Sequence, residues 1–526
     1  MIHLCLAKMS ETGMEQKYIQ EAFDTQWVAP LGPNVNAFEK DLECFINDCH
    51  LERSREISEI SPCASLSRDD KGGSREISEI SPCASLSRDD KGNMLSRDDK
   101  GGSRDDKALS KRVVALSNGT AAVHLALIAC GVGPGDEVIV QSFTFCASSH
   151  PVTYLGATPV FVDSEPETWN IDPDLLEEAI KDRIAKTGKK PKAIVPVALY
   201  GMPYDLDRIM DIANRYEIPV IEDAAEGFGS RYKGQVLGTA GRYGVLSFNG
   251  NKMITTSGGG ALICKDKTDW DKIMWLATQA RESYPYYQHE TIGYNYRMSN
   301  ICAGIGRGQM TVLNAHIAHH HHVQALYEQL LADVPGITVH TQPQCHLDQA
   351  SCHFEQPTCH VERSRDISEI SPCASLSRDD KGNNGRRNDM GNSRDDIPVY
   401  DSNYWLTTIT LDPSLKVKGQ ENAYKQIITS AVGGAAGVIH TASTAVTDCQ
   451  PNDNVEAMRL ALLAAGIESR PLWKPMHKQP VYRHSPAYVN GVSEGLFKVG
   501  MCLPTGPCVT DEQVAYIANT IKASIL

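Results

Sequence analysis

An alternation of buried strands, short turns and amphipathic helices begins at Lys111 and constrains the fold more than any other feature of the sequence. The stretch VVALSNGTAAVHLALIACG is typical of a strand, an Asn-Gly turn and a helix that ends at Gly131. KAIVPVALYG is a continuous apolar run, as expected of a parallel strand covered on both faces. The alternation predicts an α/β fold with a mostly parallel sheet, whose ligands bind beyond the carboxyl ends of the strands.

Near-identical repeats interrupt this pattern. SREISEISPCASLSRDDKG occupies residues 54–72 and 74–92, and it returns at 364–382 with Asp366 in place of Glu. Two tandem copies and one distant copy do not make a solenoid. Their Ser, Arg and Asp content, with a Pro and few large apolar residues, predicts disorder. We interpret residues 50–110 and 342–402 as two inserted surface segments, and a docking or regulatory motif is the alternative.

Without the insertions about 400 residues remain, which suits a large domain plus a smaller one. The strand YWLTTITL and the helices expected over residues 454–465 and 511–524 predict a smaller α+β domain at the C-terminal end. The expected units are an N-terminal segment (1–49), a large domain (111–341) and a C-terminal domain (403–526).

Charge and composition exclude several classes of partner. The formal charge of −14 argues against nucleic acid or an anionic membrane as the main partner. No apolar run reaches the roughly 18 residues of a membrane span, and the first residues are too charged for a secretion signal. The 16 cysteines are scattered without a CxxC pair, which favours reduced thiols and a cytoplasmic location.

Three short motifs carry candidate chemistry. Asn118-Gly119-Thr120-Ala121 lies at a strand-to-helix turn, where N–H groups and a hydroxyl bind phosphate, although a plain helix cap reads the same way. Asp223 ends a buried strand, where an acid is either a helix cap or the partner of a cation. Lys252 follows Ser247 among small and polar residues, which suits an imine-forming amine, although a single lysine near glycines is more often a surface lysine.

Together the motifs closely resemble the pyridoxal phosphate-dependent sugar aminotransferases of the DegT/DnrJ/EryC1/StrS family. The resemblance begins with FDTQWVAPLGPNVNAFEKDL and runs through SNGTAAVHLAL, IEDAAEGFGS, SFNGNKMITTSGGGAL, GYNYRMSNICAGIG, ESRPLWKPMHKQPVY and CLPTG, so that it covers nearly everything except the repeats. It implies a type I aspartate-aminotransferase fold and pyridoxal 5'-phosphate as the cofactor.

The resemblance also implies roles for single residues. Lys252 is the Schiff-base lysine and moves the proton between the substrate and the cofactor. Asp223 pairs with the pyridine nitrogen. Glu226, where the family usually has Gln, lies near the ring hydroxyl, and Phe145 stacks on the ring.

The remaining implied residues contact the phosphate and the substrate. Thr120, Ala121 and Ser247 match the phosphate contacts, and Asn295 matches an asparagine that reaches the phosphate from the partner subunit, so a homodimer is expected. Arg297 and His477 are expected on the substrate side. His477 is equally well explained as a packed histidine of the second domain.

Lys252 decides between two activities within the family, because a dehydratase branch has His at that position. Transamination is therefore favoured, with L-glutamate as the usual amino donor. The WVAPLGP, EDAAE and GNKMITTSGGGAL forms most resemble enzymes that act on UDP-2-acetamido-4-keto-2,6-dideoxyhexoses. Such enzymes make UDP-N-acetylbacillosamine-type amino sugars for glycans and surface polysaccharides.

Two other classes of function compete with this interpretation. A non-catalytic cofactor-binding member, or one impaired by its insertions, retains the motifs, but neither insertion interrupts one. A repeat-based interaction protein requires ordered repeats. A further pattern is the histidine run, in which His316 and His320 share a helix face; without a nearby acid or cysteine we expect a solvated face and no metal.

Overall fold

The computed structural model describes residues 1–47, 87–88, 94–95, 111–344, 399–424 and 449–526. The expected disorder of the repeats concerns residues that lie almost entirely outside these ranges. Two short paired strands, β1 (Ser87–Arg88) and β2 (Met94–Leu95), fall within the first predicted insertion. The predicted second insertion, residues 342–402, includes a strand of the folded protein at its end. This strand, β13 (Tyr400–Asp401), pairs with β8 (Arg231–Tyr232) of the large domain.

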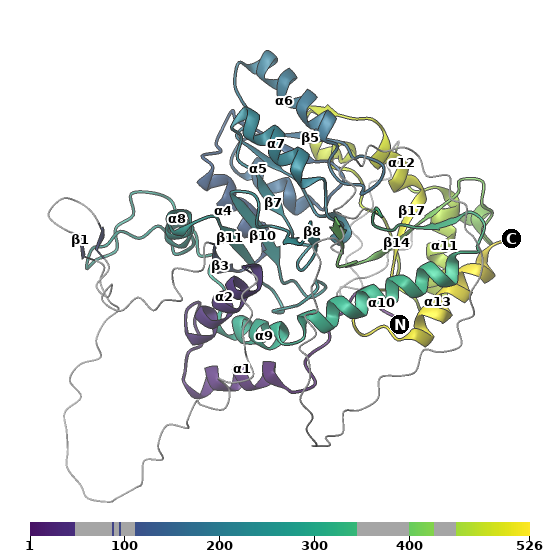
Figure 1. Cartoon of the computed structure of the whole chain (residues 1–526), viewed down its shortest axis with the longest axis horizontal. Coiled ribbons are helices and arrows are strands. Elements are labelled where there is room, and N and C mark those ends of the chain that lie inside the picture. The colour runs from purple at the N-terminus through teal and green to yellow at the C-terminus, as the bar shows by residue number, and fades with distance from the viewer. Residues whose placement is uncertain (48–86, 89–93, 96–110, 345–398, 425–448) are drawn as a thin grey trace, which may run out of the picture.

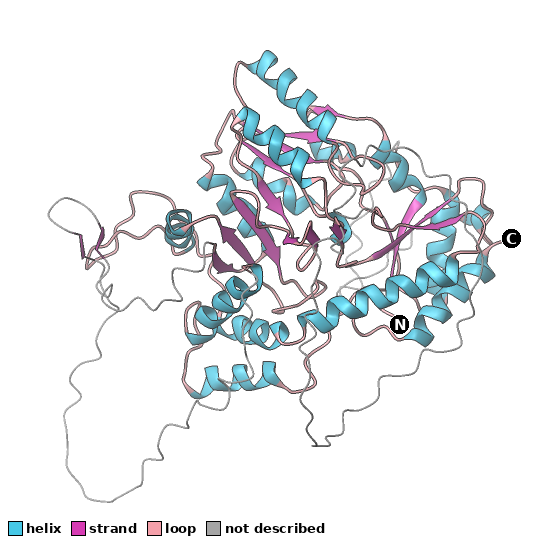
Figure 2. Ribbon diagram, in the orientation of Figure 1, coloured by secondary structure: helices cyan, strands magenta, loops and turns pink. Residues whose placement is uncertain are grey.

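A mostly parallel sheet organises the large domain (Figures 1 and 2). The strand order β16-β5-β4-β6 continues through parallel bridges between β6 and the β7 segment into β7-β10-β11-β3. Within the described residues, β11 alone runs against its neighbours in this sheet. The strands are β3 (Arg112–Leu116), β4 (Glu137–Gln141), β5 (Thr158–Val162), β6 (Ala193–Val195), β7 (Ile221–Asp223), β10 (Tyr243–Ser247), β11 (Gly260–Cys264) and β16 (Ala487–Tyr488). The predicted fold class is confirmed.

Helices cover both faces of this sheet, and each face has its own apolar core. One core includes residues of α2 (Pro33–Ile46), α6 (Pro173–Thr187) and α7 (Leu206–Tyr216), and the other includes residues of α4 (Gly119–Ala129), α5 (His150–Tyr154) and α8 (Lys267–Ala277). At the N-terminal end, α1 (Met14–Asp24) and α2 pack against α9 (Asn300–Met310). Burial on both faces explains the continuous apolar runs of the sequence.

The small domain is α+β, as predicted. Its antiparallel sheet has the order β12-β14-β17-β15, and α11, α12 and α13 belong to the same part of the chain. The elements are β12 (Ile337–Val339), β14 (Thr407–Leu411), α11 (Asp453–Ala464), β15 (Arg470–Pro471), α12 (Val492–Val499), β17 (Gly500–Leu503) and α13 (Asp511–Ser524). A third small sheet joins β13 and β8 to β9 (Gln235–Val236).

The two domains exchange elements, which the predicted boundaries at residues 341 and 403 did not allow for. Strand β12 lies before the second insertion but belongs to the small sheet, whereas β16 lies in the C-terminal part but pairs with β5. The long helix α10 (Leu313–Leu331) runs from the large domain to the small one (Figure 1). In the part of the chain that the structure describes, no helix has both the length and the apolar character of a membrane span.

Candidate active site

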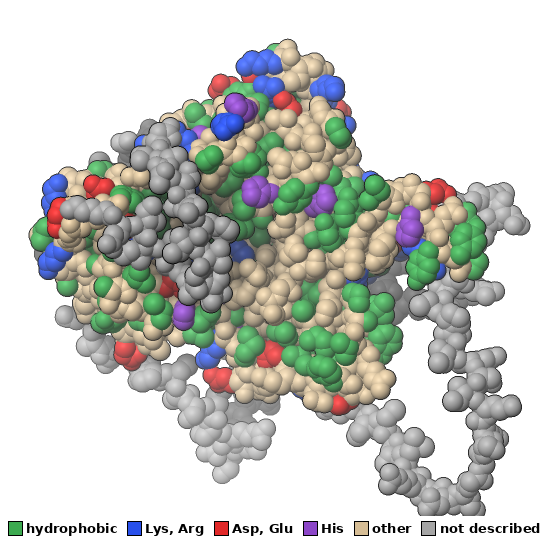
Figure 3. All heavy atoms as spheres, turned by 180° about the vertical axis from the view of Figure 1, so that it is seen from behind, with side chains coloured by type: hydrophobic (Ala, Val, Ile, Leu, Met, Phe, Trp, Pro, Cys, Tyr) green, Lys and Arg blue, Asp and Glu red, His purple; other side chains and the backbone are tan. Residues whose placement is uncertain are grey.

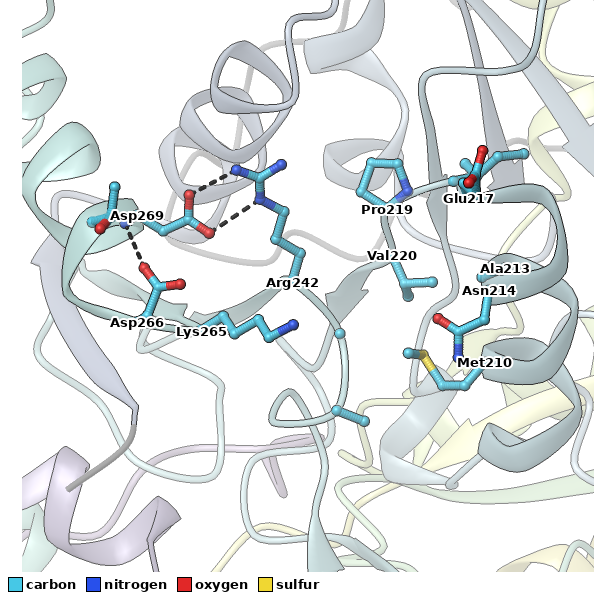
Figure 4. Close-up of a pocket in the computed structure, with 14 residues that line it drawn as sticks. Met210, Ala213, Asn214, Glu217, Pro219, Val220, Arg242, Lys265, Asp266 and Asp269 are labelled. Atoms are coloured by element: carbon cyan, nitrogen blue, oxygen red, sulfur yellow. Dashed lines mark hydrogen bonds and ion pairs between the residues drawn. The ribbon is translucent and has the colours of Figure 1, made fainter. Parts of the chain in front are cut away.

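Most of the predicted cofactor residues meet in a cavity of about 270 Å³ at the carboxyl ends of β7 and β10. Six of the predicted residues line it: Thr120, Phe145, Asp223, Glu226, Ser247 and Lys252. A larger cavity of about 720 Å³ opens at the opposite edge of the sheet, beside Val220 and Arg242 (Figure 4). Arg242 is already paired there with Asp269, at 2.8 Å, and none of the predicted site residues lines that cavity. The smaller cavity is therefore the candidate active site.

The start of α4 forms one wall of the site. Gly119 and Thr120 line the cavity, and the first N–H groups of a helix have no acceptor within it. Gly260 allows the turn to approach so closely, because a Cβ on it would lie 2.4 Å from the carbonyl carbon of Asn118. Ala121 does not line the cavity. Its N–H is already engaged, because it donates to Oδ1 of Asn118 at 2.7 Å. A wall built in this way is suited to an anion.

Asp223 is 4% exposed at the end of β7. Its Oδ2 accepts a hydrogen bond from the Ser148 hydroxyl at 2.7 Å, and its Oδ1 accepts one from the N–H of Ala225 at 3.1 Å. Burial raises the pKa of Asp223, while these two donors and the nearby Lys252 lower it. A buried carboxylate with neutral donors on both oxygens is suited to pair with a cation in the cavity.

The amine of Lys252 lies between a carboxylate and an indole ring. Its Nζ is 3.6 Å from Oε1 of Glu226 and 4.0 Å from the ring centre of Trp405. The other oxygen of Glu226 accepts a hydrogen bond from the N–H of Tyr200 at 2.8 Å. Burial raises the pKa of Glu226, and Lys252 lowers it. The amine is thus held at the wall of the cavity that also contains Asp223.

Aromatic rings surround the mouth of the site. Phe145 follows β4 and is 49% exposed, with its ring centre 5.4 Å from that of Trp473. The ring of Trp473 stacks on Tyr200 at 6.1 Å, and the backbone N–H of Trp473 donates to the Tyr200 hydroxyl at 2.8 Å. A flat ring bound in the cavity would find an apolar face here.

Arg297, which was predicted on the substrate side, does not line the cavity of its own chain. Its guanidinium donates to Oε1 of Glu39 and, at 3.0 Å, to the carbonyl of Ala115, and its side chain is 8% exposed. The flanking tyrosines lie near His124 on the neighbouring helix, with ring centres 5.0 and 6.0 Å away. Arg297 therefore joins the N-terminal helix α2 to strand β3.

Asn295 and His477 also lie outside the cavity lining. Asn295 is exposed, and its backbone forms an antiparallel bridge with Thr278. Nδ1 of His477 lies 2.6 Å from the Ser142 hydroxyl, and burial lowers the pKa of this histidine. Its contact matches the packed histidine that was the alternative interpretation.

Three residues of the site were missed in the sequence. Ser148 lies three residues after Phe145, on a 3-10 turn (Cys146–Ser148) that aims its hydroxyl at Asp223. A polar residue at that spacing in SFTFCASS was the available signal. Trp405 and Trp473 come from the C-terminal part of the chain, and no local pattern connects them with Lys252.

The face that His316 and His320 share on α10 is buried, whereas His322 of the same run is exposed. His316 and His320 are buried, and their Nδ1 atoms lie 3.2 Å and 2.9 Å from the carbonyls of Met253 and Tyr404. Among the residues that the structure describes, no group of three or more His, Cys, Asp and Glu side chains is arranged to hold a metal ion. The prediction of a solvated face was wrong for these two histidines, because their side of the helix packs on the backbone at Met253 and Tyr404.

Comparison with known proteins gives consistent matches. The sequence profile of the DegT/DnrJ/EryC1/StrS aminotransferase family matches residues 106–370 and 421–522. EpsN of Bacillus subtilis (strain 168), which carries the name of a pyridoxal phosphate-dependent aminotransferase, is 33% identical over 517 residues, covering 97% of this chain and 92% of EpsN. GDP-perosamine synthase of Caulobacter vibrioides is 46% identical over 222 residues, covering 42% of this chain and 58% of the relative. A DegT DnrJ EryC1 StrS aminotransferase from Brucella abortus shares the fold, with a TM-score of 0.64, 21% identity, and 97% and 95% coverage of the two chains.

Proposed function

Because the chain belongs to the DegT/DnrJ/EryC1/StrS aminotransferase family, we propose that it transfers an amino group from L-glutamate to UDP-2-acetamido-4-keto-2,6-dideoxyhexose. Family membership makes the chain a pyridoxal phosphate-dependent sugar aminotransferase with a type I fold. The single observation that carries the proposed reaction is the cavity in which the Lys252 amine, the buried Asp223 and the start of α4 lie together.

The residues of the cavity fit pyridoxal phosphate. The start of α4 with Thr120 and Ser247 would hold the phosphate, and Asp223 would hold the protonated ring nitrogen. Phe145 would cover one face of the ring, and Lys252 would be the covalent attachment. When bound, the cofactor supplies an electron sink for the electron pair left on the substrate carbon.

Lys252 transfers the proton in each half-reaction, and Glu226 and Asp223 support it. Nζ of Lys252 takes the proton from the α-carbon of the amino donor in the first half-reaction and delivers a proton to C4 of the sugar in the second. Glu226, at 3.6 Å, orients the amine between these steps. Asp223 keeps its charge in a buried place, because Ser148 and Ala225 donate to it.

A GDP-linked sugar is a second candidate for the substrate. One relative is named GDP-perosamine synthase, which favours a GDP-linked sugar as the alternative substrate. Parallel assays with UDP- and GDP-linked 4-keto-6-deoxy sugars separate the two. Release of an amino sugar from the UDP substrate supports the proposal, and turnover of the GDP substrate alone overturns its UDP part.

We also propose a cytoplasmic homodimer with shared active sites. Exposed apolar side chains of the N-terminal segment, Phe23, Trp27, Val28 and Leu31, are suited to an interface. Figure 3 shows hydrophobic patches on the back face of the molecule. The exposed Asn295 fits a residue that reaches into a partner's phosphate site. Light scattering of the purified protein tests the dimer, and a monomer at assay concentration overturns it.

The absorption spectrum with pyridoxal phosphate is the first test of the function. We expect a visible band that bleaches on addition of L-glutamate and that is absent in Lys252→Ala. Lys272→Ala is the matched control, because Lys272 lies on α8 and donates to the carbonyl of Ala129 at 3.0 Å, outside the cavity lining. A wild-type band that no amino donor changes would favour the competing interpretation, a family member that binds the cofactor without transamination.

A further inference from the structure

Both backbone carbonyls that flank Lys252 are held by side chains from distant parts of the chain. The indole N–H of Trp405 donates to the carbonyl of Asn251 at 2.7 Å. On the other side, Nδ1 of His316 lies 3.2 Å from the carbonyl of Met253. Because carbonyls on both sides are fixed, the lysine-bearing loop has little freedom to shift.

Two polar side chains, Asn403 and His320, hold the backbone at Trp405. Its backbone N–H donates to Oδ1 of Asn403 at 2.9 Å. The side-chain amide of Asn403 in turn donates to the carbonyls of Glu226 and Phe228, at 3.0 and 2.9 Å. The preceding carbonyl, that of Tyr404, lies 2.9 Å from Nδ1 of the fully buried His320. Trp405 is 2% exposed, so its ring has one well-defined position.

The same ring contacts the reacting amine. Nζ of Lys252 lies 4.0 Å from the ring centre of Trp405 and 3.6 Å from Glu226, whose second oxygen is engaged by the N–H of Tyr200. A protonated amine above an indole face is attracted to it, most strongly where water is excluded. Trp405 thus acts on Lys252 twice, through the loop backbone and through the amine.

We propose that Trp405 is a positioning residue for Lys252: its indole N–H fixes the lysine-bearing loop and its ring face fixes the amine. The inference rests on the proposed function in that Lys252 is taken as the reacting amine. Trp405→Phe keeps a ring face and removes the N–H donor. Trp405→Leu removes both.

The test is the rate at which borohydride traps pyridoxal phosphate on Lys252, followed by mass spectrometry of the lysine peptide. We expect Trp405→Phe to slow trapping about tenfold and Trp405→Leu about a hundredfold, since a misplacement of about 1 Å has effects of that size. Trp270→Phe is the matched control. Its indole N–H also donates to a backbone carbonyl, that of Val113 at 2.9 Å, but on α8, outside the cavity lining.

A merely structural Trp405 would lower the thermal midpoint of the variants and leave trapping in the folded protein at the rate of the Trp270→Phe control. That outcome overturns the proposal, as does a wild-type protein that is not trapped at Lys252. A second measurement, kcat and KM for L-glutamate, should show the loss in kcat, with KM within about twofold. If wild-type protein is trapped at Lys252 but reacts with no amino donor, the proposed function fails, and the order of trapping rates still decides the role of Trp405.

Discussion

The Ser148 hydroxyl donates a 2.7 Å hydrogen bond to Oδ2 of Asp223, the buried carboxylate at the end of β7. Burial raises the pKa of Asp223, and this bond works against the rise. A carboxylate that must pair with a protonated ring nitrogen has to be ionised at working pH. The small hydroxyl of Ser148 therefore helps to set the pH range in which Asp223 performs its proposed role.

Replacing Ser148 by Ala should raise the lower limit of the pH range in which Asp223 is ionised. A donor to the ionised form is lost, so the pKa of Asp223 rises and its charge is present only at higher pH. We expect the acid limb of kcat for the glutamate half-reaction to move up by roughly one pH unit. Ser149→Ala is the control, because the neighbouring Ser149 hydroxyl donates to the carbonyl of Cys146 instead. Identical acid limbs in the two variants would contradict the prediction.

Gly260→Ala should displace the turn at the start of α4, which is the proposed phosphate site. The new Cβ would lie 2.4 Å from the carbonyl carbon of Asn118 and 2.5 Å from the nitrogen of Gly119, both backbone atoms of the turn that begins α4. We expect the stability to fall by about 1–3 kcal/mol and the dissociation constant for pyridoxal phosphate to rise at least tenfold. Fluorescence titration with the cofactor measures the change.

Gly258→Ala is the control for that substitution, since a Cβ there meets nothing within 4 Å. If Gly260→Ala binds pyridoxal phosphate as tightly as Gly258→Ala, the close approach of β11 to the turn does not shape the phosphate site.

The core of the fold could be predicted because it depends on local patterns, whereas most site residues came from the family resemblance. Apolar runs mark the strands of a sheet buried on both faces, and Asp223 and Ser247 are the last residues of β7 and β10. Residues at the carboxyl ends of neighbouring parallel strands meet at one edge of the sheet. The cavity follows from that rule.

The contacts that the sequence did not predict are ones that no local pattern encodes. Arg297 has a side chain long enough to reach outward or inward, and the position of Glu39 on α2 decides that it turns inward. Trp405 comes about 150 residues after Lys252 and beyond an insertion, so only the packing of β14 and α10 on the large domain brings it there. Strand β12 looked like part of the large domain because sequence proximity does not show which sheet a strand joins.

His320 should make the protein acid-sensitive. Burial lowers its pKa from 6.5 to about 3, so it stays neutral in the folded state while the unfolded chain takes up a proton. Its contribution to stability is therefore complete above pH 6.5 and is lost as the pH falls toward 3. Between pH 7 and pH 5 this loss is about 2 kcal/mol.

His320→Asn keeps a donor for the carbonyl of Tyr404 and removes the titrating ring. Urea unfolding at pH 7 and pH 5 should show a smaller loss of stability in His320→Asn than in the wild-type protein, by about that amount. His322→Asn, at an exposed position on the same helix, should lose as much as the wild type. An equal loss in all three proteins would mean that His320 does not report on acid unfolding.

The proposed homodimer with shared active sites leads to a complementation experiment. If Asn295 serves the partner's phosphate site, Lys252→Ala and Asn295→Ala chains are each weak alone, but a mixed dimer has one site with both wild-type residues. Unfolding and refolding the two variants together should give about a quarter of the wild-type activity, because half of the dimers are mixed and each has one intact site. A mixture no more active than the sum of its parts would mean that Asn295 acts within its own chain or not at all. We expect complementation in the mixed dimers, because Asn295 is exposed and does not line the cavity of its own chain.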